Sequence, residues 1–235
     1  MHQILVYADS LTWGIVPDTR KRWPFTTRWP GVMEHTLVES GQDVRVIEDC
    51  LNGRRTVWDD PFKSGRNGRV GLEQRIEVNS PLSLVILMLG TNDFQSMHQF
   101  TAAHSAQGMA ALVQAVRQAP IEPGMPMPAI LIVAPPPINE PKGAIAPKFE
   151  GAAEKSSGLA AALSVVAKER DCEFFDAGTV TSTSRVDGVH LDADQHQRLG
   201  LAMADVVGPI LHRVPFSIEQ GVERGRFRSS TRSNI

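Results

Sequence analysis

Residues 4–14 read ILVYADSLTWG, a run of apolar residues that ends in a short polar turn. Five successive apolar residues are typical of a strand that is buried on both faces, as strands of a parallel sheet are. Ser10 falls at the turn that follows this strand. A serine there presents its hydroxyl at the edge of the sheet, beside backbone amides that can stabilise an oxyanion. Serine is also a favoured helix N-cap, which is the alternative role for Ser10.

Apolar runs and amphipathic stretches alternate along the rest of the chain. Further buried strands are predicted at residues 44–47, 84–89, 129–134 and 173–175. Helices are predicted at about residues 30–39, 70–78, 103–118, 154–170 and 193–211, the last with a capping pair, Asp192 and Gln195. This alternation predicts an α/β fold, a five-stranded parallel sheet with helices on both faces. In such sheets, functional side chains gather beyond the carboxyl ends of the strands.

Polar turns follow the next two strands. Asn92 comes after the third strand, in the sequence GTND, and its side-chain amide can donate a hydrogen bond to an oxyanion. Gly53 follows the second strand, where a glycine lets the backbone approach a ligand closely. Both segments are also ordinary turn sequences, so each is modest support for a site when taken alone.

The loop before the last helix supplies a carboxylate and an imidazole. Asp187 and His190 are three residues apart in the sequence DGVHLD. The carboxylate can hold one imidazole nitrogen, which leaves the other nitrogen to take a proton from a serine hydroxyl. Asp192 already serves as the helix cap, so neither residue is needed for that role. Four such signals at one edge of a single sheet favour a serine-dependent active site.

Composition limits the other classes of function. The 235 residues include 24 Lys and Arg and 26 Asp and Glu, a net charge of −2 that argues against a nucleic-acid partner. Two cysteines match no disulfide framework or metal site, and no export signal or membrane span is apparent. We therefore expect a cytoplasmic location and no membrane partner. Residues 1–212 are predicted to form one domain, and residues 213–235, rich in arginine and serine, a C-terminal arm or tail.

The motifs together resemble the SGNH, or GDSL-type, hydrolases. Ser10, Gly53, Asn92 and His190 match the four sequence blocks of this family in order. Residues 9–14 (DSLTWG), 88–93 (MLGTND), 135–137 (PPP) and 175–178 (FDAG) are similar to the bacterial arylesterase and acyltransferase branch. The resemblance implies a three-layer, flavodoxin-like fold. One departure is Ala8, because the family usually has glycine at this position.

Family roles carry over by position. The resemblance implies that Ser10 is the nucleophile, His190 the general base and Asp187 its partner. The oxyanion hole would comprise the Ser10 amide, the Gly53 amide and the Asn92 side chain. It implies no metal and no organic cofactor. We also expect Leu11 and Trp13 to contact the substrate.

The expected function is hydrolysis of small aryl or short-acyl carboxylic esters through an acyl-serine intermediate, with acyl transfer to alcohols as a further activity. The alternatives are a carbohydrate deacetylase or thioesterase of the same fold, or a non-catalytic binding module. A nucleotide-binding domain would need a glycine-rich phosphate loop, and an ordinary α/β-hydrolase would need Gly-x-Ser-x-Gly; the sequence has neither. We expect a homo-oligomer, because the aromatic and proline-rich segments at residues 23–30 and 135–147 would leave apolar surface exposed on a monomer.

Overall fold

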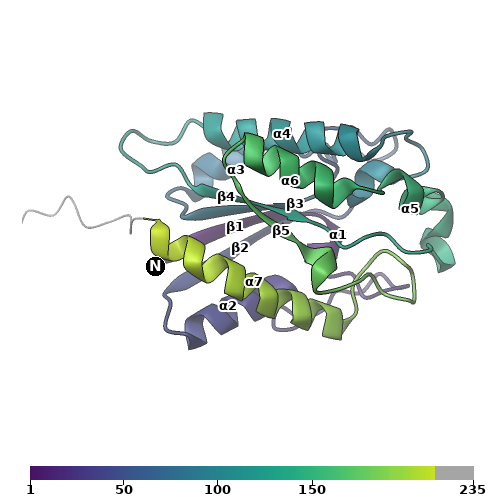
Figure 1. Ribbon diagram of the computed structural model, residues 1–235, viewed down its shortest axis with the longest axis horizontal. Helices are drawn as coiled ribbons and strands as arrows, with labels where there is room; N and C mark the ends of the chain where they lie inside the picture. Colours follow the sequence, from purple (N-terminus) through teal and green to yellow (C-terminus); the bar gives the residue numbers. More distant parts are fainter. Residues whose placement is uncertain (215–235) are drawn as a thin grey trace, which may run out of the picture.

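A computed structural model describes residues 1–214 of the chain. Its centre is a parallel sheet of five strands in the order β2-β1-β3-β4-β5 (Figure 1). The strands are β1 (His2–Ala8), β2 (Val44–Cys50), β3 (Leu84–Met88), β4 (Ala129–Ala134) and β5 (Glu173–Asp176). The predicted fold class, a five-stranded parallel sheet within a three-layer α/β fold, is confirmed.

The middle of the sheet is its most apolar part. All five residues of β3 are buried, as are six of the seven residues of β1, because helices cover both faces of these strands. Burial on both faces explains why these segments read as continuous apolar runs. The chain passes from β1 outward to β2, then returns to β3 on the other side of β1. The carboxyl ends of β1 and β3 therefore meet at the point where the strand order reverses, which is the usual ligand site in such sheets.

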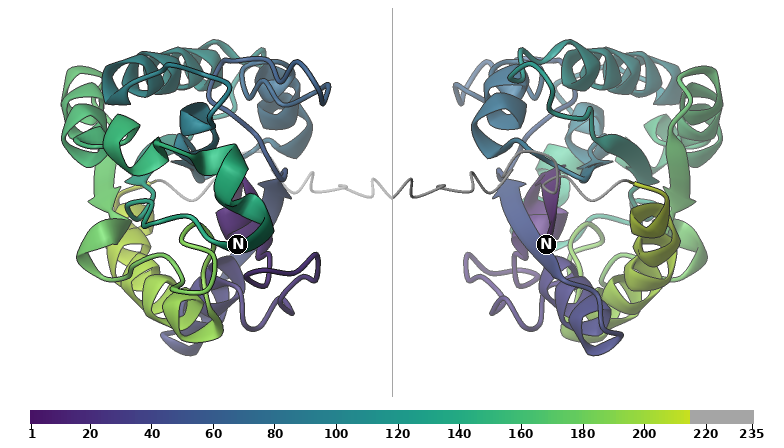
Figure 2. Two further views of the ribbon diagram at one scale, coloured as in Figure 1. Left: turned by 90° about the vertical axis from the view of Figure 1, so that its right-hand side faces the viewer. Right: turned by 90° about the vertical axis from the view of Figure 1, so that its left-hand side faces the viewer.

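The longer helices form two layers, one on each side of the sheet. In Figures 1 and 2, α3, α4 and α6 lie on one face and α2 and α7 on the other. Helix α2 packs against α7, and α4 packs against both α3 and α6. The bounds are α2 (Trp29–Glu39), α3 (Leu72–Asn79), α4 (Ala102–Gln118), α6 (Leu159–Glu169) and α7 (Ala193–Arg213).

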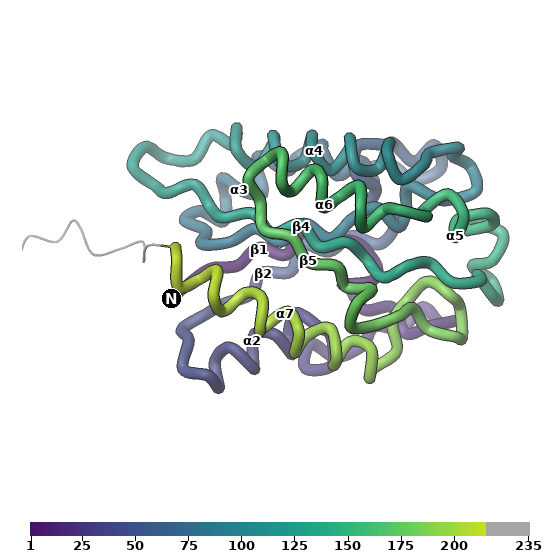
Figure 3. The backbone as a smooth tube through the Cα atoms, in the orientation of Figure 1, coloured from purple at the N-terminus to yellow at the C-terminus, as the bar shows by residue number. Residues whose placement is uncertain are grey.

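The shorter elements lie mostly near the carboxyl ends of the strands. They are α1 (Ser10–Trp13), α5 (Ala152–Lys155) and the 3-10 helices η1 (Thr91–Phe94), η2 (Gly143–Phe149) and η3 (Ala177–Thr179). Loops and short helices therefore crowd one edge of the sheet, at the right of Figure 3 and facing the viewer in the left panel of Figure 2. This edge carries the candidate site.

The largest difference from the sequence prediction lies between β4 and β5. The single helix expected at residues 154–170 is instead two helices, α5 and α6, separated by Ser156, Ser157 and Gly158. Serine and glycine are weak helix formers, and the periodicity of the flanking apolar residues concealed this break.

The end of the described chain follows the sequence prediction closely. Helix α7 begins with the predicted capping box of Asp192 and Gln195 and ends at Arg213, one residue past the expected end of the domain. Of the tail predicted at residues 213–235, Arg213 belongs to α7, and residues 215–235 lie outside the described residues. Within residues 1–214, no helix is long and apolar enough to cross a membrane.

Candidate active site

Ser10 stands at the first position of α1, directly beyond the end of β1. The preceding residue, Asp9, caps this short helix by accepting a hydrogen bond from the Leu11 amide at 3.0 Å. The N-cap is thus Asp9, and the alternative capping role considered for Ser10 is not what the structure shows. The Ser10 side chain faces a cavity of about 330 Å³, although the residue is only 5% exposed.

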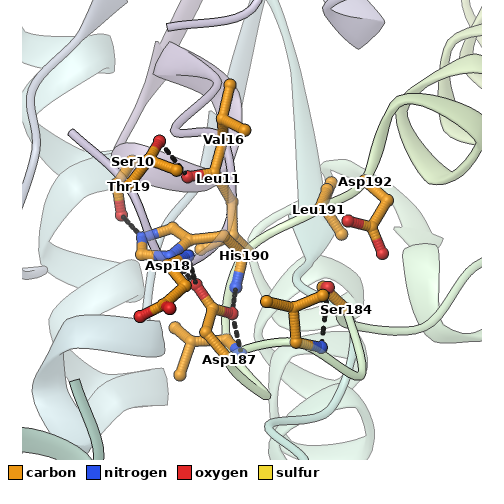
Figure 4. A network of polar contacts seen from close by, with 12 residues as sticks. Ser10, Leu11, Val16, Asp18, Thr19, Ser184, Asp187, His190, Leu191 and Asp192 are labelled. Carbon is orange, nitrogen blue, oxygen red and sulfur yellow. Dashed lines mark hydrogen bonds and ion pairs between the residues drawn. The ribbon is translucent and has the colours of Figure 1, made fainter. Parts of the chain in front are cut away.

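His190 and Asp187 lie beside Ser10 although 180 residues separate the serine from the histidine in sequence. The His190 Nε2 atom is 3.2 Å from Ser10 Oγ, and Nδ1 is 2.7 Å from Asp187 Oδ2 (Figure 4). With the proton on Nδ1, the imidazole donates to Asp187 and its Nε2 lone pair accepts from the serine hydroxyl. This is the hydrogen-bond order of a serine–histidine–aspartate triad.

The environment of Asp187 keeps its carboxylate ionised. Burial acts to raise the pKa of Asp187, but the hydrogen bond from the His190 ring and the imidazole charge outweigh it. The backbone amides of Val189 and His190 add hydrogen bonds of 2.9 Å each to Oδ1. The net effect lowers the pKa of Asp187 to about 2. A negative charge therefore faces the imidazole at any pH well above 2.

A tight turn holds Asp187 and His190 in this orientation. Gly188 has φ +77°, and an added Cβ atom would lie 2.2 Å from the carbonyl oxygen of Glu140. The turn is anchored to the neighbouring loop by hydrogen bonds from the Asn139 amide to Gly188 O and from the Lys142 amide to Asp187 O. Only glycine fits both the backbone conformation and the close approach.

We predict that Gly188→Ala destabilises the fold by more than the conformational penalty alone. Gly151→Ala is the matched control, because Gly151 has φ +69° with no atom within 4 Å of the added Cβ. The control should lose about 1–2 kcal/mol for the left-handed conformation, and Gly188→Ala should lose more because the Glu140 carbonyl must also move. Thermal unfolding of both variants measures the difference. Equal melting temperatures would contradict the close approach at Gly188.

Three hydrogen-bond donors belong to residues that line the cavity beside Ser10 Oγ. The backbone amides of Ser10 and Gly53 donate to no acceptor within residues 1–214. Gly53 lies in the loop after β2 with φ +84° and lines the same cavity as Ser10, His190 and Asn92. The arrangement can present two amides and a side-chain NH2 group to a developing negative charge. Of the sequence-predicted site residues, Ser10, Gly53, Asn92, Asp187 and His190 are thus brought together in one cavity.

A buried aspartate orients the Asn92 amide. Asn92 Nδ2 donates to Asp9 Oδ2 at 2.9 Å, which leaves the second hydrogen of this group for another acceptor. Burial raises the pKa of Asp9 to about 6, although the Leu11 amide, His190 and Asn92 oppose this shift. The Asp9 carboxyl thus accepts hydrogen bonds from both the Leu11 amide and Asn92. It caps α1 and positions Asn92 at the same time.

A second contact on Asn92 was not predicted from the sequence. Gln95 Nε2 donates to Asn92 Oδ1 at 2.7 Å, and Gln95 Oε1 accepts from Arg55 Nη2 at 2.6 Å. Arg55 is fully buried and pairs with Asp60 at 2.9 Å. Hydrogen bonds therefore hold both the Oδ1 and the Nδ2 atom of the Asn92 side chain. The sequence offered only a weak signal for this chain of contacts: Gln95 follows Asn92 by three residues, which is one turn of the 3-10 helix η1.

Leu11 and Trp13 are not among the residues that line the cavity, and their expected contact with substrate stays a prediction. Leu11 is 1% exposed and belongs to the hydrophobic core, while the Trp13 ring packs under the guanidinium of Arg22 at 4.7 Å. The reason is the α1 helix: successive side chains rotate by about 100°, so Ser10 faces the cavity and Leu11 faces the core. The apolar wall is instead formed by Ile15, Ala144, Ile145 and Phe149.

Ala8, the departure from the family pattern, fits the sheet without strain. It is fully buried at the end of β1, in register with Cys50 of β2 and Met88 of β3. It is not among the described non-glycine residues with positive φ, so its backbone does not need glycine. The Ala8 methyl group is buried in the core.

No metal site is evident near the triad. Among residues 1–214, no three His, Cys, Asp or Glu side chains gather closely enough to hold a metal ion.

Comparisons with known proteins agree with this geometry. Residues 9–198 match the GDSL-like Lipase/Acylhydrolase family. A solved structure of an aryl esterase from M. smegmatis, in an inhibitor-bound form, is 36% identical, with a TM-score of 0.85 over 89% of this chain and 100% of that one. Est24, a carbohydrate acetylesterase from Sinorhizobium meliloti, is 37% identical, with a TM-score of 0.84 over 89% of this chain and 100% of Est24. An arylesterase from Vibrio mimicus is 33% identical over 91 residues, 39% of this chain and 38% of that relative.

The chain therefore belongs to the GDSL-like lipase/acylhydrolase family, and the resemblance seen in the sequence is confirmed. Membership places it in the class of carboxylic ester hydrolases. The match to the Vibrio mimicus arylesterase covers little more than a third of that relative's length, whereas the solved structures match over their full length.

Proposed function

We propose that this protein is a serine esterase that cleaves small carboxylic esters, with aryl or short-acyl groups, through an acyl-serine intermediate. The observation that carries the proposal is the pair of contacts on His190: 3.2 Å from Nε2 to Ser10 Oγ and 2.7 Å from Nδ1 to Asp187 Oδ2. Both contacts are buried and open onto one cavity with the three amide donors. Family membership supports the same chemistry.

In the first half of the reaction, Ser10 Oγ attacks the ester carbonyl carbon. The hydroxyl proton passes to His190 Nε2, and the carbonyl oxygen becomes an oxyanion. The amides of Ser10, Gly53 and Asn92 donate hydrogen bonds to this oxygen, so they stabilise the transition state more than the ground state. The intermediate then collapses: the carbon–oxygen bond to the alcohol breaks, and the imidazolium returns the proton to the leaving oxygen.

In the second half, water replaces the alcohol. His190 Nε2 takes one proton from the water as its oxygen bonds to the acyl carbon. Collapse of the second oxyanion breaks the bond to Ser10 Oγ, which recovers its proton from the imidazolium. The products are a carboxylic acid and the free enzyme, so neither a redox partner nor a cofactor enters the balance.

A substrate panel that varies the acyl chain and the alcohol separately tests the proposal. We expect turnover of p-nitrophenyl acetate, with activity falling as the acyl chain outgrows the cavity of about 330 Å³. No turnover of any ester by the folded wild-type protein would overturn the proposal in favour of a non-catalytic binding module. Hydrolysis of thioesters but not of oxygen esters would favour the thioesterase alternative.

The carbohydrate deacetylase alternative has one specific observation in its favour. Est24, described as a carbohydrate acetylesterase, is 37% identical to this chain over 89% of its length. The polar cavity wall, which includes Asn52, Thr19 and Asp18, could hold sugar hydroxyls. An acetylated monosaccharide in the same panel separates the two: a kcat/KM far above that for p-nitrophenyl acetate would identify the sugar ester as the preferred class.

Acyl transfer is a further part of the proposal. The acyl-serine can react with an alcohol in place of water, and the apolar wall of the cavity favours the carbon chain of an alcohol over water. With vinyl acetate and a primary alcohol, we expect an early ratio of ester to acid that exceeds the mole ratio of alcohol to water. Gas chromatography of both products measures it. A ratio no higher than the mole ratio would mean that the protein is a plain hydrolase.

Homo-oligomerisation and a cytoplasmic location stay predictions from the sequence. For the oligomer, the apolar surface expected at residues 23–30 is smaller than the sequence suggested, since Trp29 is fully buried in the core and Phe25 is 37% exposed. Light scattering gives the direct test of assembly: a mass of 25.7 kDa at micromolar concentration would identify a monomer.

A further inference from the structure

The mouth of the catalytic cavity carries a group of cations that the triad does not use. Arg20, Lys63 and Lys148 line the same cavity as Ser10 and His190. They come from three separate segments: the loop after α1, the loop after β2, and η2. Here they are called the cationic rim. Such a convergence is notable in a chain whose net charge is −2.

The rim cations lack partners of opposite charge. Within the described part of the chain, none of the three lies within 4.0 Å of a carboxylate oxygen. By contrast, two of the three carboxylates that line the cavity are already engaged. Asp60 pairs with the buried Arg55 at 2.9 Å, and Asp187 holds His190 at 2.7 Å.

Asp18 is the remaining carboxylate of the cavity wall, and even together with Asp187 it does not balance three cations. Its backbone amide donates to Asp187 Oδ2 at 3.4 Å (Figure 4), while its carboxylate lies beside Gly143 of η2. With Asp60 paired to Arg55, the wall carries the three positive charges of its cations against the two negative charges of Asp18 and Asp187, an excess of one. Because the cavity is partly enclosed by protein, the field of these cations is screened less than on an open surface.

The rim cations also act on one another. Burial is the main cause that lowers the pKa of Lys148; Asp60 opposes it, and the positive charges of Arg55, Lys63 and Arg20 add to it. Lys148 is thus repelled by Arg20 and Lys63, and the carboxylate that acts in its favour, Asp60, is already paired with Arg55. A negatively charged ligand would relieve this repulsion.

From this arrangement we infer that the preferred substrates are anionic esters, in which a carboxylate or similar group close to the scissile ester binds the cationic rim. The inference rests on the proposed esterase function and narrows its substrate class. A neutral sugar or alkyl ester would leave the rim unpaired. An acidic alcohol or a dicarboxylic acyl group would place its charge there while the ester carbonyl reaches Ser10.

Matched ester pairs test the inference and show which side of the ester carries the charge. The first pair is 4-acetoxybenzoate and its methyl ester, in which the charge lies on the leaving group. The second pair is mono-4-nitrophenyl succinate and its methyl ester, in which the charge lies on the acyl group. We expect the ratio of kcat/KM for the anionic member to that for the neutral member to be about tenfold for at least one pair, since each exposed charge contact contributes little.

Variants locate the source of this ratio. The triple variant Arg20→Gln/Lys63→Gln/Lys148→Gln should bring the ratio close to one, mainly through KM for the anionic ester. Lys168→Gln, which removes an exposed cation from α6, is the matched control and should leave the ratio unchanged. At about 1 M salt, where the Debye length is about 3 Å, the wild-type ratio should fall in the same way.

The possible results distinguish a failure of the anionic-ester inference from a failure of the proposed esterase function. Wild-type turnover of the neutral esters, with no anionic preference or with a preference that the triple variant keeps, would overturn the inference and leave the esterase function standing. No turnover of any ester would overturn the esterase function. In that case, calorimetry of 4-acetoxybenzoate with the Ser10→Ala variant still tests whether the cationic rim binds an anionic ester. Binding that is lost when the three rim substitutions are added supports the anionic site, and no binding contradicts it.

Discussion

Replacing Ser10 by alanine should abolish ester hydrolysis and leave the fold intact. The hydroxyl that forms the acyl intermediate is lost, so we expect kcat to fall by a factor on the order of 10⁴–10⁶. Among residues 1–214, Ser10 makes one side-chain hydrogen bond, to His190 Nε2, so little stability depends on it. Steady-state hydrolysis of p-nitrophenyl acetate, with thermal unfolding as the check on the fold, measures both parts.

Two comparisons make this prediction specific. Ser157→Ala, at an exposed serine between α5 and α6, should retain wild-type turnover. His190→Ala should lose nearly as much as Ser10→Ala, and the double variant should lose no more than either single variant, because triad members act as a unit. Additive losses in the double variant would mean that the two side chains act in separate steps, contrary to the contact at 3.2 Å.

The second large effect is expected at Asn92. Asn92→Ala removes a donor that acts mainly when the oxyanion forms, so we expect kcat to fall by about 10²–10³-fold with little change in KM. Asn79→Ala, at the end of α3, is the control and should behave as wild type. An unchanged kcat for Asn92→Ala would return this residue to a purely structural role in the turn after β3.

Gln95 offers a finer test of the same donor. Gln95→Glu keeps an acceptor for Arg55 but loses the NH2 group that donates to Asn92 Oδ1 at 2.7 Å. We expect about a tenfold loss in kcat, the equivalent of one hydrogen bond of about 1.4 kcal/mol. If Gln95 acts through Asn92, the double variant Asn92→Ala/Gln95→Glu should be no slower than Asn92→Ala alone. A further tenfold loss would show that Gln95 acts by another route.

The fold was largely predictable because the strongest signals were local. The apolar runs of β1, β3 and β4 and the capping box of α7 each determine a structure within a few residues of themselves. The break between α5 and α6 was missed for a related reason. Ser156 and Ser157 interrupt the helix locally, but the apolar spacing on either side suggested one continuous element.

The site was predictable where a residue follows a strand, and unpredictable where it depends on tertiary contacts. Ser10 and Asn92 lie directly beyond β1 and β3, so the parallel topology alone brings them to one edge. The burial of Leu11 depends on the rotation of α1, which the sequence did not reveal. The contact between Arg55 and Gln95 joins residues 40 positions apart, and no sequence pattern predicts it.

The central claim is that Ser10 carries the acyl group during turnover, and mass spectrometry of the trapped intermediate tests it most directly. The protein is mixed with p-nitrophenyl acetate, quenched in acid within the first turnover and digested. The account predicts the added mass of one acetyl group on the peptide that contains Ser10, and its absence in Ser10→Ala. Acetyl found only on another residue, with the Ser10 peptide unmodified while p-nitrophenol is released, would contradict it.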